Sequence, residues 1–371
     1  MIDERLKKLA KNLINYSCSL KKDEKILIDA MDTDSEFLCE LVKETYKAGA
    51  YPFVNICMSK VNRALLLGTN ETREKLKCDF DLPIMEKMDA YISIRSKNVY
   101  ENSDVPKENI KAVNKYYNLP VHHETRVAKT KWVILNYPTS VVAQNAGMST
   151  EAFEDFYFDV CNLDYSKMDK AMNPLKALIE KTDKVRIVAP GTDLTFSIKG
   201  MPAIKCSGKN NIPDGEIFTA PVKNSVNGVI KYNIPILSGN GERHEDITLT
   251  FKDGKIINAT SKSNEDINKI FDIDEGARYV GEFSFGINPY IKKPMLDILF
   301  DEKIMGSIHF TPGSCYDDCD NGNKSSLHWD LIQIQTPEYG GGEIYFDDVL
   351  IRKDGRFVLD ELLGLNPENL V

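Results

Sequence analysis

Short apolar runs alternate with amphipathic stretches through the first half of the chain, and this alternation most restricts the fold. The apolar runs at residues 25–30, 51–57, 90–95 and 131–137 are typical of buried strands, and the segments between them show helical spacing. Strands separated by helices form a parallel sheet with helices on its faces. The first half is therefore predicted to be an α/β domain with a parallel sheet flanked by helices.

The second half consists of short strand-like runs joined by tight turns. Residues 184–189 and 194–199 flank a Pro-Gly turn, and residues 247–260 have a hairpin pattern around Asp253-Gly254. Strands joined by such turns pair antiparallel. This half is therefore predicted to be an α+β domain with mostly antiparallel strands.

The chain of 371 residues is long enough for two domains with separate cores. Residues 150–181 have acidic and aromatic residues at helical spacing, which predicts one or two helices that bridge the halves. The strand-and-turn pattern begins after Asp183. We therefore expect an α/β domain over residues 1–183 and an α+β domain over residues 184–371.

Charge and hydropathy argue against two classes of partner. The formal net charge is −9, and lysines are interspersed with acidic residues, so a nucleic acid would be repelled. No run of about 18 apolar residues is present to cross a membrane. The N-terminal Met-Ile-Asp-Glu-Arg also lacks the basic start of a signal peptide. We expect a cytoplasmic protein with neither a nucleic-acid nor a membrane partner.

The eight cysteines are scattered along the chain instead of forming the framework of a small secreted domain, which predicts reduced thiols. Cys315 and Cys319 lie four positions apart and could be metal ligands. Because no second cysteine pair completes a structural zinc set, the favoured interpretation is that they are buried or loop cysteines.

The predicted parallel sheet also raises the hypothesis of a nucleotide-dependent enzyme. No glycine-rich phosphate loop follows any of the strand-like runs. The first run leads into Asp29-Ala-Met-Asp-Thr-Asp-Ser, which is neither a dinucleotide fingerprint nor a P-loop. This hypothesis therefore has no direct support.

Histidine and carboxylate side chains gather near the end of the second half. His309 and His328 are two of only five histidines, and Asp330 stands two places after His328. In a strand, side chains two apart project from the same face, so His328 and Asp330 could hold one ion together. Imidazole and carboxylate are common ligands of Zn, Co or Mn in hydrolytic sites. Taken alone, the spacing fits a surface or hydrogen-bonded pair at least as well.

Two glutamates stand in apolar surroundings in the same half. A Pro-Asp-Gly turn delivers Glu216 to the start of an apolar strand, and Glu282 lies within Gly-Glu-Phe-Ser-Phe-Gly. A buried carboxylate is costly unless it is paired or bound to a cation, although each glutamate alone could be a salt-bridged strand residue. Together with His309, His328 and Asp330, they supply the ligands of a two-metal hydrolase.

These motifs resemble the aminopeptidase T and aminopeptidase S family of bacterial metalloaminopeptidases. The matching motifs are Asn-x-Pro-Asp-Gly-Glu-x-Phe-Thr-Ala-Pro at 211–221, Gly-Glu at 281–282, His309 with Tyr316, and Ser-x-x-His-x-Asp at 325–330. The likeness extends to Pro-Thr-Ser-Val-Val-Ala-Gln-Asn-Ala-Gly-Met-Ser at 138–149 and Gly-Thr-Asp-Leu at 191–194. It therefore covers most of the chain.

The resemblance implies a dinuclear site with two divalent metal ions per chain, either Zn, Co or Mn. One carboxylate would bridge the ions, and the implied ligands are Glu216, Glu282, His309, His328 and Asp330. Tyr316 would donate a hydrogen bond to the developing oxyanion. Glu282 is expected to relay a proton to the leaving amine. The second predicted domain would then be the metal-binding catalytic domain.

The implied activity is that of a metal-dependent aminopeptidase, which hydrolyses the N-terminal bond of short peptides through a water activated by two ions. The family also implies a homodimer. The chain departs from the family pattern at Phe310-Thr-Pro-Gly and in an acidic, cysteine-bearing loop at 315–323, so substrate preference stays open. The alternative is a peptide- or ligand-binding protein on the same fold that has lost catalysis.

The other histidines are not candidate ligands. Adjacent residues on a helix point about 100° apart, so we expect a solvated or hydrogen-bonded role for His122 and His123. His244 lies in a charged turn and is expected to be exposed. Trp329 alternates with the proposed ligands and should point into the core.

Overall fold

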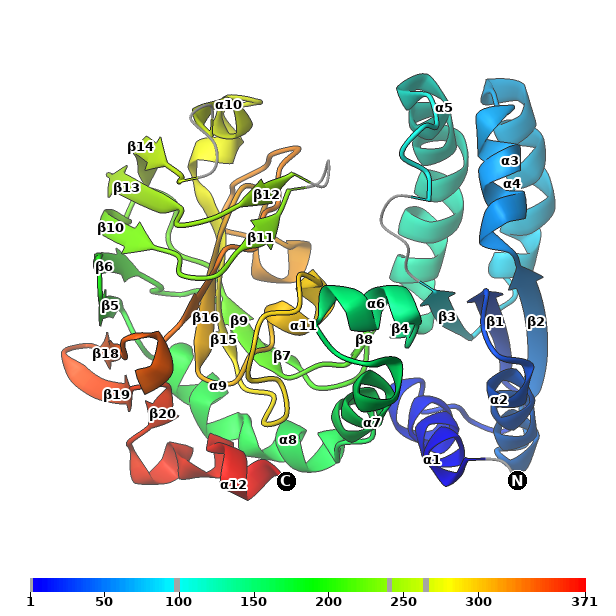
Figure 1. Cartoon of the computed structure of the whole chain (residues 1–371), viewed down its shortest axis with the longest axis horizontal. Helices are drawn as coiled ribbons and strands as arrows, with labels where there is room; N and C mark the ends of the chain where they lie inside the picture. Colours follow the sequence, from blue (N-terminus) through cyan, green and yellow to red (C-terminus); the bar gives the residue numbers. More distant parts are fainter. Residues whose placement is uncertain (1–2, 97–100, 239–241, 263–266) are drawn as a thin grey trace. The chain divides into compact units, whose positions relative to one another are not determined.

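The structure, a computed structural model, describes residues 3–96, 101–238, 242–262 and 267–371. The chain forms two compact units (Figure 1): the first comprises residues 1–162 and 208–213, and the second comprises residues 163–207 and 214–371. The predicted domain boundary at 183/184 stays a prediction. The compact units themselves divide after Asn162.

Residues 150–181 form three helices, where one or two were predicted. They are α7 (Thr150–Cys161), α8 (Tyr165–Ala171) and α9 (Asn173–Ile179). The Asp164 side chain accepts hydrogen bonds from the amides of Ser166 and Lys167, so a new helix begins after α7. α8 and α9 contact η6 (Asp360–Leu365), which explains why they belong to the second unit.

A five-stranded sheet of order β2-β1-β3-β4-β8 forms the centre of the first unit. Its members all pair in parallel and are β1 (Lys25–Met31), β2 (Tyr51–Cys57), β3 (Ala90–Ser96), β4 (Lys131–Tyr137) and β8 (Asn211–Ile212). Ile26, Ile28 and Ala30 alternate as buried residues along β1. The predicted parallel sheet is therefore confirmed.

Helices join these strands. They are α1 (Glu4–Asn12), η1 (Leu13–Ser17), α2 (Ser35–Lys47), α3 (Ser59–Leu67), α4 (Glu71–Met85), α5 (Lys107–Val113), η2 (Asn114–Val127) and α6 (Ser140–Asn145). α1 packs against α2, and α4 packs against η2. Met85 of α4, Val121 of η2 and Tyr91 of β3 form a buried cluster, which attaches these helices to the sheet.

The second unit is built from antiparallel sheets, as predicted for the α+β half. The larger sheet has the order β14-β13-β10-β6-β5-β18-β19-β20. Its strands are β5 (Lys184–Ala189), β6 (Thr192–Ser197), β10 (Asn227–Lys231), β13 (Thr248–Lys252), β14 (Lys255–Thr260), β18 (Glu343–Phe346), β19 (Val349–Lys353) and β20 (Arg356–Phe357). Asp253 and Gly254 both have positive φ at the β13–β14 hairpin, where the Asp-Gly turn was predicted.

A second antiparallel sheet of this unit has the order β17-β16-β15-β9-β7 and carries the candidate site. Its strands are β7 (Ile204–Cys206), β9 (Glu216–Thr219), β15 (Val280–Gly286), β16 (Ser307–Pro312) and β17 (Ile332–Ile334). Every residue of β15 and β16 is buried. We call this sheet the site sheet.

Aromatic side chains join the site sheet to the larger sheet. The ring centroids of Phe196 in β6 and Phe283 in β15 are 5.1 Å apart, and those of Phe251 in β13 and Phe310 in β16 are 5.9 Å apart. Such aromatic contacts between sheets bury much apolar area. The strands that carry the candidate ligands are thus held by a packed core on their other face.

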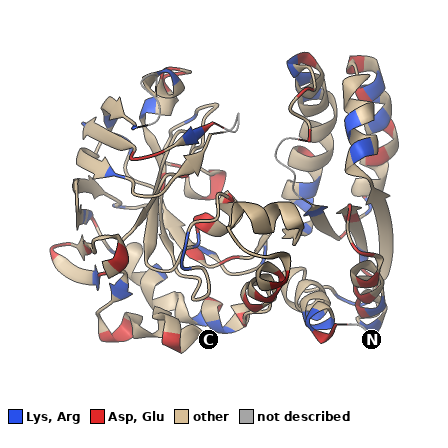
Figure 2. Ribbon diagram, in the orientation of Figure 1, with Lys and Arg blue, Asp and Glu red and all other residues tan. Residues whose placement is uncertain are grey.

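Acidic and basic side chains are interspersed along the helices of both units (Figure 2). On α4, for example, Lys75 and Glu71 form an ion pair at 2.6 Å. None of the helices in the part of the chain that the structure describes combines the length and apolar character needed to span a bilayer.

Candidate metal centre

The five predicted ligands come together in the second unit. Their ligand atoms form two groups, each within 4.8 Å: Glu216, Glu282 and His309 in the first group, and Glu282, His328 and Asp330 in the second group. Glu282 belongs to both groups. The residues come from three strands of the site sheet and from the segment that precedes β17.

Strand register explains why side chains from β9, β15 and β16 meet. Residues paired across neighbouring strands present their side chains on the same face. Ser284 pairs with His309, and Gly286 pairs with Glu216. Because Glu282 lies two places before Ser284, it shares their face.

The second group forms without a regular strand at His328. This histidine makes an isolated bridge with Gly313, which corrects the expectation that it lies in a strand beside Asp330. Asp330 is held instead by a hydrogen bond, since Thr311 Oγ1 donates to Asp330 Oδ1 at 2.8 Å. Thr311 pairs with Glu282 across β15 and β16, so Asp330 lies near the shared glutamate.

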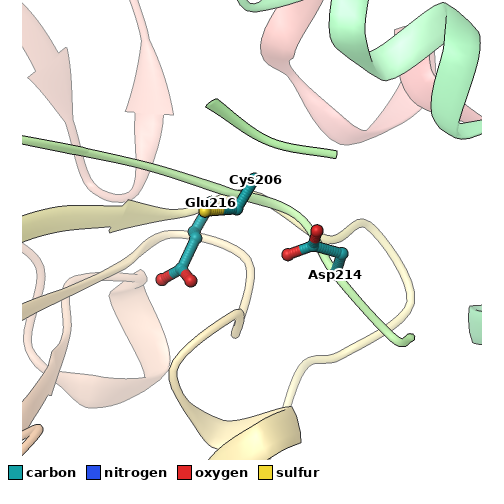
Figure 3. Close-up of side chains that lie close together, drawn as sticks. All are labelled: Cys206, Asp214 and Glu216. Carbon is teal, nitrogen blue, oxygen red and sulfur yellow. The ribbon is translucent and has the colours of Figure 1, made fainter. Parts of the chain in front are cut away.

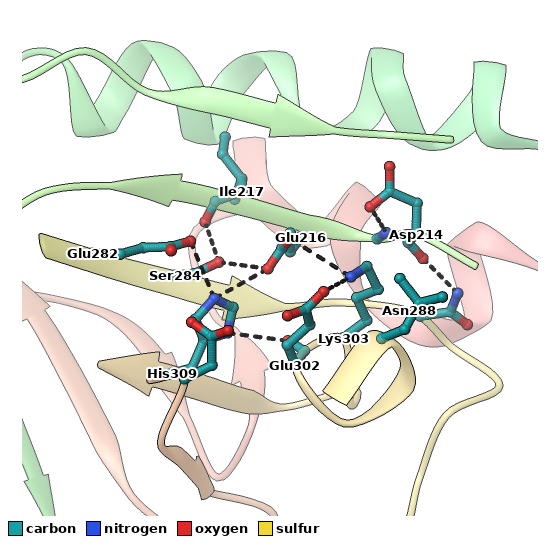
Figure 4. A network of polar contacts seen from close by, with 12 residues as sticks. Asp214, Glu216, Ile217, Glu282, Ser284, Asn288, Glu302, Lys303 and His309 are labelled. Atoms are coloured by element: carbon teal, nitrogen blue, oxygen red, sulfur yellow. Dashed lines mark hydrogen bonds and ion pairs between the residues drawn. The ribbon is translucent and has the colours of Figure 1, made fainter. Parts of the chain in front are cut away.

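Each carboxylate oxygen of Glu282 lies near a different histidine. Oε1 is 3.2 Å from His309 Nε2, and Oε2 is 3.3 Å from His328 Nε2. His309 Nε2 is also 3.1 Å from Glu216 Oε2, and His328 Nε2 is 3.3 Å from Asp330 Oδ1. Figure 4 shows Glu216, Glu282 and His309 converging. Glu282 therefore links the two groups.

Both histidines present Nε2 to the carboxylates. His309 Nδ1 lies 3.2 Å from the carbonyl of Glu302, and His328 Nδ1 lies 2.8 Å from the carbonyl of Ser314. A carbonyl oxygen only accepts, so Nδ1 donates in each ring and the neutral ring keeps its lone pair on Nε2. This is the orientation of metal-binding imidazoles.

The two groups are largely buried and contain three carboxylates, so they attract cations strongly. Glu216 and Glu282 are 6% and 3% exposed. His328 Nε2 is buried and makes no hydrogen bond within the described part of the chain, although a carboxylate oxygen of Glu282 and one of Asp330 each lie 3.3 Å away. Burial disfavours imidazolium, but the carboxylates outweigh it and raise the pKa of His309 to about 10 and that of His328 to about 12. Two imidazoles and three carboxylates in this arrangement fit divalent metal ions.

Comparison with known proteins supports this assignment. A family model described as thermophilic metalloprotease (M29) matches residues 2–357. The chain belongs to the M29 metalloprotease family. The predicted resemblance and the prediction of a metalloprotease-family enzyme are confirmed, and the alternative of a ligand-binding protein is not favoured.

Named relatives of this M29 chain are aminopeptidases. Aminopeptidase PepS of Streptococcus thermophilus is 26% identical, with 89% of this chain and 92% of that protein covered. Aminopeptidase AmpS of Bacillus subtilis (strain 168) is 26% identical, with 89% of each chain covered.

Two solved structures share the fold. Wild-type AmpT from Thermus thermophilus matches with a TM-score of 0.80 and 20% identity, covering 96% of this chain and 99% of that one. A 2,5-dihydroxypyridine dioxygenase from Pseudomonas putida KT2440 matches with a TM-score of 0.62 and 13% identity, covering 98% and 99%. The fold prediction is thus confirmed, while the fold alone does not define the reaction.

Tyr316 lies beside the second group of this M29 chain. Its ring centroid is 4.8 Å from that of His328 and 5.4 Å from that of Phe218, and 46% of the residue is exposed. Partial burial, together with the charges of Glu282 and Asp330, raises the pKa of Tyr316, so its hydroxyl stays protonated. A protonated phenol can donate a hydrogen bond.

A buried ion pair that the sequence analysis did not predict lies next to the first group. Lys303 has no exposed side-chain surface; its ammonium forms an ion pair with Glu302 and lies 3.7 Å from Glu216 Oε1 (Figure 4). Burial disfavours its charge, but Glu302, Glu216 and Asp214 outweigh this effect and raise the pKa of Lys303. The sequence marks this pair only by the charged triplet Asp301-Glu302-Lys303, a pattern that is also common at exposed surfaces.

A third group overlaps the first. Ligand atoms of Cys206, Asp214 and Glu216 lie within 4.8 Å of one another (Figure 3). Burial raises the pKa of the Cys206 thiol well above its ordinary value, and the charges of Glu216 and Asp214 add to this effect. The thiol is therefore neutral.

His244 and Trp329 are both buried and pack against each other. The expectation that His244 is exposed is wrong, because it is 0% exposed and its ring centroid lies 5.2 Å from that of Trp329. Trp329 is buried, as predicted. His122 packs against Tyr91 and Tyr117 in the first unit.

The eight cysteines are all free, as the prediction of reduced thiols requires. Cys315 and Cys319 are buried, in agreement with the favoured interpretation. Cys315 Sγ lies 3.0 Å from Asp320 Oδ1 and 3.2 Å from the carbonyl oxygen of Asn323, and its single proton is directed at these two acceptors.

Proposed function

We propose that this M29 protein is a metal-dependent aminopeptidase that removes the N-terminal residue of short peptides with two divalent ions. The observation that carries the proposal is that Glu282 places one oxygen near each of two histidines. A carboxylate shared in this way is suited to bridge two ions. The aminopeptidase names of relatives that match over most of the chain support the substrate class.

The proposed ligands fall into two sets that share Glu282. Glu216, Glu282 and His309 would hold the first ion, and Glu282, His328 and Asp330 the second. Carboxylate and imidazole donors accept Zn, Co or Mn, so each of these metals is a candidate.

The negative charge of the buried carboxylates supports the proposal of two divalent ions per chain. The three candidate groups and the partner of Lys303 contain five carboxylates, namely Asp214, Glu216, Glu282, Glu302 and Asp330. Glu302 pairs with Lys303, and both imidazoles must be neutral to bind a metal, so the other four carboxylates would leave four negative charges for two divalent cations to balance. Uncompensated charge is costly in a buried site.

The bound ions would polarise the scissile carbonyl and lower the pKa of a water molecule. The Tyr316 hydroxyl would donate a hydrogen bond to the oxygen of the carbonyl as negative charge develops there. The predicted proton relay by Glu282 to the leaving amine competes with its bridging role, because both of its oxygens would then be bound to ions. The net charge of −9 would attract the free α-ammonium of a peptide, which favours cleavage at its N-terminus.

We also infer a homodimer formed through the first unit. β2 is an edge strand of its sheet, and Phe53 and Ile56 on it are 47% and 68% exposed. Exposed apolar residues on an edge strand are typical of an interface. Light scattering should give twice the chain mass, and Ile56→Lys should give the mass of one chain; a monomeric wild type would contradict this inference.

A cytoplasmic location is likewise proposed. The eight free cysteines support it, because a reducing compartment preserves thiols.

The test of function is a panel of aminoacyl p-nitroanilides assayed with and without metal. We expect turnover that a chelator abolishes and that Zn, Co or Mn restores, with two ions per chain by elemental analysis. N-terminally acetylated substrates are the control and should not be cleaved. A metal-loaded protein that binds peptides without cleaving them would favour the alternative of a ligand-binding protein.

A further inference from the structure

The two oxygens of the Glu216 carboxylate have different neighbours. Oε2 lies 3.1 Å from His309 Nε2, and it accepts a hydrogen bond from Ser284 Oγ at 3.2 Å. Oε1 lies 3.7 Å from Lys303 Nζ. One oxygen thus belongs to the first metal group, while the other faces an ammonium supplied by the chain itself.

Lys303 is held where it stands by its surroundings. It follows the short helix α11 (Ile298–Asp301) and precedes β16, and its side chain is fully buried. Its ammonium pairs with the Glu302 carboxylate, and Figure 4 shows it between Glu302 and Glu216. A buried lysine of this kind is charged only because carboxylates surround it.

The same region contains the ligands of the third group. Cys206 on β7 and Asp214 at the turn before β9 lie close to Glu216 (Figure 3). A thiol and two carboxylates are a suitable ligand set for a divalent transition metal. Lys303 Nζ lies 3.7 Å from Glu216 Oε1, so the ammonium stands beside a member of this group.

We propose that the Lys303 ammonium serves as a built-in cation that takes the place of a metal ion in the third group and holds Glu216 in the first group. This inference rests on the proposed two-metal function and adds a positioning residue to it. The Lys303 ammonium neutralises Oε1 of Glu216 and leaves Oε2 free to bind the first ion. It also repels a divalent ion from Cys206.

Cobalt spectroscopy tests the proposal. A thiolate bound to Co²⁺ gives a charge-transfer absorption in the near ultraviolet, whereas carboxylate and imidazole ligands do not. Wild-type protein titrated with Co²⁺ should bind two ions per chain without this absorption. Lys303→Gln should bind a third ion and gain the absorption, because a metal that reaches the thiol deprotonates it.

Two further variants separate charge from packing. Lys303→Arg retains the positive charge and should behave as wild type does, without thiolate absorption. Lys303→Gln with Cys206→Ser should lose the absorption that Lys303→Gln gains. Cys206→Ser alone should bind as many Co²⁺ ions as wild type, because Cys206 is outside both metal groups. Circular dichroism verifies that each variant is folded.

The outcomes distinguish this inference from the proposed function. A folded Lys303→Gln that binds no more Co²⁺ than wild type and shows no thiolate absorption would overturn the inference. Thiolate absorption in the wild type would overturn it too. The Co²⁺ titration of the wild type therefore still tests the inference if Lys303→Gln does not fold. Wild-type protein with fewer than two ions would instead contradict the two-metal function, whatever the difference between wild type and variant.

Discussion

Replacing Glu282 by glutamine tests whether one carboxylate serves both metal groups. The substitution keeps the shape of the side chain and removes its charge. Glu282 is 3% exposed, with its oxygens 3.2 Å from His309 Nε2 and 3.3 Å from His328 Nε2. Both groups therefore lose the same negative charge.

Coulomb's law gives the scale of this loss. At about 4 Å and an effective dielectric constant of about 20, a unit charge and a divalent cation attract each other by about 8 kcal/mol. Part of this is regained, because the amide oxygen can still bind an ion and a buried charge no longer has to be desolvated. We expect a net loss of at least about 3 kcal/mol at each group, which is roughly a hundredfold weaker binding.

Equilibrium dialysis against buffered Zn²⁺ or Co²⁺, followed by elemental analysis, measures the metal content. Turnover of leucine p-nitroanilide, which should fall at least a hundredfold, is measured on the same samples. Glu338→Gln, an exposed position, is the control that loses the same charge. Loss of turnover with both ions retained would assign Glu282 to proton transfer alone. A variant that keeps both its metal and its turnover would refute the reasoning.

Three other substitutions test separate parts of the account. Tyr316→Phe should lower kcat about 100- to 1,000-fold while leaving metal content unchanged, and an unaltered kcat would exclude the oxyanion role. Burial raises the pKa of Asp301 to about 7, so this group makes the fold less stable as pH rises from about 4 to 7. Asp301→Asn should therefore flatten the decline in melting temperature between pH 5 and 8, and an unchanged slope would contradict the assignment. Phe283→Ala removes a fully buried ring that contacts Phe196 and Phe310, and it should cost about 3–5 kcal/mol in urea unfolding. A loss under about 1 kcal/mol would show that these rings do not join the two sheets.

The features that follow from local pattern were predictable from the sequence. Buried parallel strands need continuous apolar runs, so β1 to β4 could be recognised before their pairing was known. Tight turns likewise marked the antiparallel half. The ligands Glu216 and Glu282 stood out because a carboxylate inside an apolar strand requires a partner.

Features that depend on tertiary position were not predictable. Lys303 and Glu302 are sequence neighbours like many exposed charged pairs, and only the packing before β16 buries the lysine. Cys206 gave no sign of its approach to Glu216, since it enters from β7 at the edge of the site sheet. His244 looked exposed because its neighbours are charged, but its ring packs on Trp329.

The end of the first compact unit illustrates the same limit. The change in sequence pattern after Asp183 marks where the short strands and tight turns begin. α8 and α9 nevertheless belong with the second unit, because they contact η6 near the end of the chain. Contacts between segments so far apart leave no local pattern in the sequence.

The central claim is most directly tested by anomalous diffraction from crystals grown with Zn²⁺ or Co²⁺. The account predicts two anomalous peaks per chain, each about 2.0–2.2 Å from its ligand atoms. One should lie among Glu216, Glu282 and His309, and the other among Glu282, His328 and Asp330. A single peak, or ions bound away from Glu282, would contradict the claim.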